Sequence, residues 1–160
     1  MRILVVGDDP GEKMVEGEAK QNQITRVATW EEFTEGTFDQ IYLTGVVELL
    51  PREQVVDALK AYGPHLAEMG ELHVRVPSLE WAAREIATQD SPDFAAYHWL
   101  YGSVERPHRC GMTVLWLRLA LLNAGYNVRR ATQLVVKVGD VPALENYAIA
   151  VWKGSDEANA

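Results

Sequence analysis

The chain has 160 residues, the size of one domain, and 48% of them are hydrophobic while 24% are charged. This balance excludes a disordered or fibrous chain. The formal net charge of −8 argues against nucleic-acid binding over the whole surface, because an acidic surface repels phosphates. Cys110 is the only cysteine, so an internal disulfide and a cysteine-rich zinc site are excluded.

The first residues lack the charged and apolar regions of a signal peptide. The longest apolar stretch, residues 114–122, is interrupted by Arg118 and is too short to span a bilayer. We therefore expect a cytoplasmic protein that does not contact membranes. A single domain is expected over residues 1–153, followed by a small polar tail over residues 154–160 that we expect to be disordered.

In the first half of the chain, short apolar runs predict strands at residues 2–6, 24–28 and 39–43. A weak helix is predicted at residues 12–21 and a single helical turn at residues 30–33. Residues 51–61 predict a further helix, because Pro51 suits a helix start and Val55, Val56 and Leu59 share one face.

In the second half, residues 72–76 alternate as a strand and end at Pro77. Ser78 and Thr113 are suited to cap helices at residues 79–88 and 114–124, and Gly125 is suited to end the second. Residues 89–104 are expected to be irregular. The last strands are predicted at residues 126–131, which residues 134–138 would extend, and at residues 146–152.

Strands separated by helices imply crossover connections and a mostly parallel α/β sheet. The last two strands lack a helix between them, so they are expected to form an antiparallel hairpin. Residues 114–122 are apolar on nearly every side, which is typical of a deeply buried or self-associating helix. We therefore predict a homodimer.

Four segments give the chain a family likeness: residues 38–51 (FDQIYLTGVVELLP), 70–77 (GELHVRVP), 101–126 (YGSVERPHRCGMTVLWLRLALLNAGY) and 146–153 (NYAIAVWK). In order and spacing they resemble the strand-four, strand-five, late-insertion and closing-strand segments of class I S-adenosylmethionine-dependent methyltransferases. The resemblance implies a Rossmann-like three-layer sandwich and, in an active protein, methyl transfer from S-adenosylmethionine. No catalytic base is assigned.

The resemblance implies cofactor-binding residues at two strand ends: Gly7, Asp8, Asp9 and Gly11 after the first strand, and Thr44 and Glu48 after the strand at residues 39–43. Ligands of open parallel sheets lie at this edge. Asp9, however, stands where the family has the middle glycine of its first loop. Its side chain would crowd the cofactor and its charge would oppose the cofactor's carboxylate, so binding is expected to be weakened or lost, as in a pseudoenzyme.

A second departure from the family is a deletion. Residues 24–33 resemble the family's third strand and the loop after it. The second strand, its helix and the acidic residue that binds the ribose are then missing, and the sheet should lack one edge strand.

The loop RPHRCG is a basic cluster in an acidic chain. Tyr101, His108 and Arg109 are therefore candidate substrate residues, with His108 and Arg109 suited to an anionic group. The alternative is that this loop is anchored by ordinary hydrogen bonds. Tyr97, Trp99 and Tyr101 similarly predict either a stacking wall or loop anchors. Cys110 is expected to be a packed thiol, and the four histidines lack the spacing of a metal site.

Two alternative functions stay open. The first is a non-catalytic binding or interaction protein on the same fold, with an unidentified small molecule or protein as partner. The second follows from the opening MRILVVGDDP, which resembles a response-regulator receiver domain. Because Thr44 stands at the phosphoacceptor position, such a domain would be degenerate, and it predicts a helix after every strand.

Overall fold

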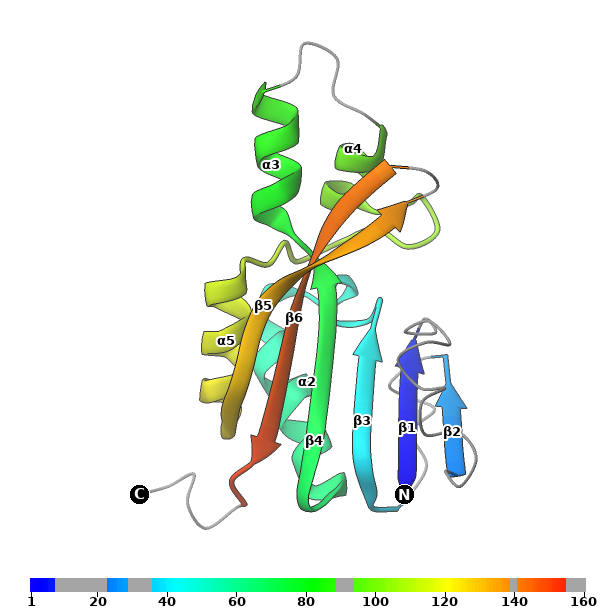
Figure 1. Cartoon of the computed structure of the whole chain (residues 1–160), viewed down its shortest axis with the longest axis vertical. Coiled ribbons are helices and arrows are strands. Elements are labelled where there is room, and N and C mark those ends of the chain that lie inside the picture. Colours follow the sequence, from blue (N-terminus) through cyan, green and yellow to red (C-terminus); the bar gives the residue numbers. More distant parts are fainter. Residues whose placement is uncertain (8–22, 29–35, 89–93, 139–140, 155–160) are drawn as a thin grey trace.

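The computed structural model describes residues 1–7, 23–28, 36–88, 94–138 and 141–154. The described strands form one six-stranded sheet in the order β2-β1-β3-β4-β6-β5 (Figure 1). Their bounds are β1 Arg2–Gly7, β2 Gln23–Val27, β3 Phe38–Thr44, β4 Leu66–Pro77, β5 Tyr126–Val138 and β6 Val141–Trp152. The helices are α2 Val55–Tyr62, α3 Leu79–Thr88, α4 Phe94–Tyr101 and α5 Val114–Asn123, and three short 3₁₀ turns are η3 Val47–Leu49, η4 Arg52–Gln54 and η5 Gly63–His65.

The topology confirms the predicted mostly parallel sheet with a C-terminal antiparallel hairpin. Strands β2, β1, β3 and β4 run parallel to one another, and β6 runs antiparallel to both β4 and β5. Among the described strands, β2 alone lies outside β1, as expected for a sheet that lacks one edge strand. The direct β5–β6 pairing differs from the helix after every strand that a receiver-like domain predicts.

Three apolar clusters of the described residues hold the fold together, the smallest of which is formed by Ile3, Val5 and Tyr42 with Ile24. The largest one fills the space between one face of the sheet and the helices α2 and α5, and it includes Leu4, Val74, Leu59 and Leu117. The second one joins α3 and α4 to the β5–β6 hairpin beyond the carboxyl end of β4 (Figure 1), and it includes Trp81. No helix among the described residues has the length and apolar character to cross a membrane.

Most predicted elements are confirmed, with small differences at their ends. The prediction that residues 89–104 are irregular is wrong, because Phe94–Tyr101 forms the helix α4. Its sequence is apolar almost throughout and therefore lacks the alternation of polar and apolar faces that predicts a helix. The helix is stabilised by packing on α3 and the hairpin. Strand β4 also begins six residues before the predicted start, in a stretch where Met69 has φ +62. The helices predicted at residues 12–21 and 30–33 lie outside the described residues.

Helix α5 buries one face and exposes the other. Leu117 and Leu121 are fully buried in the largest cluster, whereas Leu115, Leu119 and Leu122 are 65%, 45% and 38% exposed. Part of the apolar surface predicted for this helix is therefore covered within the chain. The homodimer stays a prediction, which sedimentation at high protein concentration tests.

A buried polar junction joins the elements at the end of β4. The hydroxyl of Ser78 accepts hydrogen bonds from the backbone N–H of Trp81 at 3.2 Å, as a helix cap, and from the Gln133 amide at 2.8 Å. The amide of Asn146 donates to the Met112 carbonyl at 2.7 Å. Both Ser78 and Asn146 are fully buried. The junction therefore ties α3, the hairpin and the segment before α5 to one point.

We expect Ser78→Ala to lower the free energy of unfolding by about 2 kcal/mol, because it removes a helix cap and the shortest of the hydrogen bonds that the half-buried Gln133 amide makes. Thr113→Ala is the matched control. Thr113 also caps a helix, with Trp116 N–H donating to its hydroxyl at 3.0 Å, but it does no more. This control should cost about 1 kcal/mol. Urea denaturation measures both, and a loss in Thr113→Ala that equals or exceeds that in Ser78→Ala would contradict the prediction.

Candidate functional site

The carboxyl ends of β1 and β3 lie side by side, with Gly7 paired to Thr44. Gly7 has φ +87, and a Cβ there would lie 2.2 Å from the Thr44 carbonyl oxygen and 2.3 Å from Cγ2 of Val46. Only glycine fits this position. The space that its missing side chain opens is filled by atoms of the chain itself.

Thr44, the register partner of Gly7, and Glu48 in the following turn η3 are almost buried, at 8% and 5% exposure. The Thr44 hydroxyl has no hydrogen-bond partner among the described residues. The backbone carbonyl of Glu48 accepts hydrogen bonds from Arg109 N–H at 2.8 Å and Cys110 N–H at 3.1 Å. The loop after α4 is thereby fixed to η3, at the edge where a ligand of this type of sheet is expected.

A tight turn shapes this loop. Gly102 has φ +74, and a Cβ there would lie 2.3 Å from the Arg106 carbonyl oxygen, so the turn requires glycine. The Ser103 hydroxyl accepts from Arg106 N–H at 3.1 Å, and the Arg106 guanidinium donates to the Gly45 carbonyl at 2.5 Å. The turn is therefore held against the end of β3 by a charged side chain.

His108 is half-buried beneath this turn. Its Nδ1 lies 2.9 Å from the Trp99 carbonyl oxygen. Since a carbonyl only accepts, Nδ1 carries a hydrogen and Nε2 is the nitrogen that gains or loses a proton. Burial lowers the pKa of His108, and the neighbouring His98 and Arg106 lower it further, against the effect of the Trp99 hydrogen bond.

A pocket of about 120 Å³ opens between η3, α4 and the turn. Its described lining is Leu49, His98, Ser103, Arg106 and His108. Of this set, the sequence points to Arg106 and His108, both in the basic loop RPHRCG. His98, Ser103 and Leu49 come from different elements, and no spacing in the sequence links them.

The candidate residues from the sequence fall into three groups. Gly7 and Thr44 lie side by side at the strand edge, and Glu48 lies in η3, which follows that edge along the chain. His108 and Arg109 lie in the loop bound to that edge, whereas Tyr101 is 64% exposed and contributes its backbone carbonyl to His108 N–H at 2.9 Å. Asp8, Asp9 and Gly11 lie outside the described residues.

The remaining loop candidates have structural roles. The indole N–H of Trp99 donates to the Leu144 carbonyl at 2.7 Å, so Trp99 is an anchor of α4 on the hairpin. Cys110 is 4% exposed, and burial raises the pKa of its thiol, as expected for a packed cysteine. No group of three metal-ligating side chains was found in the part of the chain that the structure describes.

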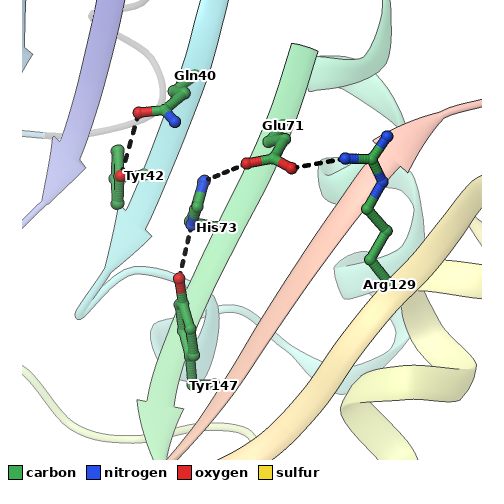
Figure 2. A network of polar contacts seen from close by, with 6 residues as sticks. All are labelled: Gln40, Tyr42, Glu71, His73, Arg129 and Tyr147. Carbon is green, nitrogen blue, oxygen red and sulfur yellow. Dashed lines mark hydrogen bonds and ion pairs between the residues drawn. The ribbon is translucent and has the colours of Figure 1, made fainter. Parts of the chain in front are cut away.

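A second polar arrangement lies on the sheet face away from α2 and α5, and Figure 2 shows it. The buried His73 is joined through Nδ1 to the Tyr147 hydroxyl at 2.7 Å, and its Nε2 lies 3.4 Å from a Glu71 carboxylate oxygen. The other Glu71 oxygen accepts from Arg129 at 2.9 Å, and the Tyr42 ring stacks on the His73 ring at 4.3 Å. This network links strands β3 to β5 and lies apart from the loop pocket.

Solved structures share this architecture. A SAM-dependent methyltransferase of Methanosarcina mazei aligns with a TM-score of 0.57 and 12% identity, over 95% of this chain and 93% of its own. The N-methyltransferase NodS of Bradyrhizobium japonicum, solved with S-adenosyl-L-homocysteine, gives 0.59 and 16%, over 96% and 78%. An O-methyltransferase family 2 protein of Planctomyces limnophilus gives 0.57 and 13%, and the chain spans 50% of its length.

The chain has the fold of class I methyltransferases. No model of a protein family matches it, and no curated protein matches its sequence. At identities of 12–16% the likeness is one of fold.

S-adenosylmethionine is the cofactor that a methyltransferase fold implies. Among the described residues, the gap beside Gly7 is filled by the Thr44 carbonyl and Val46. The pocket of about 120 Å³ is smaller than the roughly 300–1,000 Å³ typical of whole-ligand sites. The described residues of this edge alone therefore do not enclose the complete cofactor, and the loop at residues 8–22 that would complete the site lies outside the described residues.

The pH dependence of stability tests the sheet-face network. Burial lowers the pKa of His73, although the nearby Glu71 acts in the opposite direction. Below the ordinary histidine pKa of about 6.5, the unfolded chain therefore binds more protons than the folded chain at this position. The free energy of unfolding should fall as the pH drops from 7.5 to 5.

Replacing His73 should make the free energy of unfolding depend less on pH. Urea denaturation of His73→Gln over the same pH range should give a smaller slope than the parent chain, whatever its absolute stability. His65→Gln is the control, since it removes a histidine that contacts the Gly36 carbonyl far from the network. An unchanged slope in His73→Gln would contradict the assigned role.

Proposed function

We propose that this chain is a methyltransferase-like protein that holds S-adenosylmethionine weakly or not at all and binds a different small molecule at the same edge of its sheet. The closed packing around Gly7 carries the proposal. In the methyltransferase resemblance a loop glycine lets the backbone approach the cofactor, whereas a Cβ at Gly7 would collide with the Thr44 carbonyl oxygen and Val46, so packing within the chain requires this glycine.

The sequence supports the same conclusion from residues outside the described part. Asp9 replaces the middle glycine of the resembling loop, and its negative charge opposes the carboxylate of the cofactor's methionine part. The acidic residue that would bind the ribose has no counterpart when residues 24–33 are aligned with the family's third strand. Crowding by the Asp9 side chain, repulsion by its charge and the lack of a partner for the ribose hydroxyls therefore all weaken binding of the cofactor.

An active methyltransferase is the second candidate, and the Thr44 hydroxyl favours it. A buried hydroxyl with no partner among the described residues needs a hydrogen-bond partner, which a polar group of a ligand could supply. Thr44 and Glu48 would then line the methionine side of the cofactor, which supplies the methyl group. Any positioning of substrate would fall to the loop that carries His108.

Calorimetric titration of the full chain with S-adenosylhomocysteine separates the two candidates. We expect a Kd above about 1 mM, that is, binding weaker than about 4 kcal/mol. Micromolar binding would overturn the proposal and support the enzyme.

The variant Asp9→Gly tests the cause of the weakness. Removing the side chain and its charge should tighten binding about tenfold, which corresponds to about 1.4 kcal/mol. Asp8→Gly is the matched control, since it removes the same charge from the neighbouring position without restoring the glycine pattern. Equal effects of both variants would show that charge alone is responsible and would contradict the steric part of the argument.

A further inference from the structure

The pocket between η3, α4 and the turn at residues 102–107 is a built feature of the fold. Arg106 is tied to the Gly45 carbonyl, Ser103 to the Arg106 backbone, and the following residues to the Glu48 carbonyl. Each of these hydrogen bonds joins the loop to itself, to the end of β3 or to η3. The lining side chains are therefore held in place before any ligand arrives, which lowers the entropic cost of binding.

The charge of the pocket is opposite to that of the chain. The net charge of the chain is −8, yet the described lining has one arginine, two histidines and a serine, and no acidic side chain. The rings of His98 and His108 lie 6.3 Å apart. Such a concentration of N–H donors around a small volume is the chemistry that recognises an oxyanion.

The size of the pocket limits the ligand. A volume of about 120 Å³ is enough for a single tetrahedral or planar charged group but not for a nucleoside. Leu49 provides the apolar side of the lining, so the rest of a ligand would extend from the charged group along the edge of the sheet.

We propose that this pocket binds the oxyanion group, a phosphate or a carboxylate, of a small molecule, with Arg106, His98 and His108 as its donors. The inference deepens the proposed function, because it names the chemical class of the small molecule taken at this edge. It also assigns His98 and Ser103 to a site that the sequence did not indicate.

Proton uptake should accompany binding. Burial together with His98 and Arg106 lowers the pKa of His108 in the free chain, and η3 offers only the neutral Leu49 to the pocket. A bound anion offsets the repulsion among these three groups and favours the protonated imidazole. Affinity should therefore rise as the pH falls from 8 to 6.

The test is an NMR titration of the histidine side chains of the full chain with inorganic phosphate and, separately, with acetate. We expect saturable shifts of His98 and His108 with at least one of these anions, stronger at pH 6 than at pH 8. Binding of phosphate alone or of acetate alone identifies which oxyanion the pocket takes. Absence of saturable shifts with both, or equal shifts with uncharged acetamide, would overturn the proposal.

Three variants localise the site. Arg106→Gln should weaken binding about tenfold, as expected for loss of a charged donor. His98→Gln keeps the loop hydrogen bonds intact and should weaken it about threefold, so it tests the site even if Arg106→Gln disturbs the turn. Arg84→Gln, on exposed α3, is the matched control and should bind as the parent chain does. A loss in Arg84→Gln equal to that in Arg106→Gln would show general charge attraction instead of a site.

The outcome is separable from that of the proposed function. If S-adenosylhomocysteine binds at micromolar concentration and the anions also bind, the proposed function fails and the oxyanion pocket stands. If neither binds, the pocket fails and weak cofactor binding stands.

Discussion

The arrangement of the second half of the chain depends on the buried hydrogen bonds at the end of β4. Ser78 and Asn146 are both fully buried, and polar groups at such depth are costly unless each finds a partner. The Met112 carbonyl satisfies the Asn146 amide and also accepts from Leu79 N–H at 3.0 Å. One backbone carbonyl thus receives donors from β6 and from the start of α3.

This constraint reaches the candidate site through the chain itself. Met112 is four residues after His108 and two after Cys110, whose N–H donates to Glu48. The loop is therefore fixed at Met112 by the junction and at Glu48 by η3. Only Gly111 lies between these two attachments, so the chain leaves η3 toward the junction along a fixed path. Before them, the Arg106 guanidinium is held at the end of β3 by its hydrogen bond to the Gly45 carbonyl, and these contacts together position the basic pocket.

The sequence predicts the sheet well because its strands are buried on both faces or alternate cleanly. In β1 the run from Ile3 to Val6 is wholly buried, which leaves no other reading of the apolar pattern. It fails for α4, whose apolar side chains follow no helical period and are ordered only by contact with α3 and the hairpin. The start of β4 is missed because of a local backbone irregularity. Met69 has a positive φ, which the residue preferences of methionine do not predict.

The candidate site also contains residues that the sequence indicates and residues that it does not. Gly7, Thr44 and Glu48 are found from the sequence because they follow strands, and parallel strands end at a common edge. His98 and Ser103 are missed because only tertiary structure brings α4 and the turn together. Gly7 is a glycine for a reason that the resemblance does not give, because a Cβ at this position would lie 2.2 Å from the Thr44 carbonyl oxygen.

A closed gap at Gly7 and an open basic pocket beside it are consistent with each other. The same strand edge presents the carboxyl ends of β1 and β3, but the first is covered by Val46 while the second is bordered by Arg106 and His108. Among the described residues, the pocket is bordered by Arg106 and His108, whereas Gly7 packs against Thr44 and Val46. In an acidic chain this directs an anionic group to the pocket over the rest of the surface, because like charges elsewhere repel it. Selectivity at this edge then comes from the loop after α4, and the inherited strand ends supply the platform on which that loop is fixed.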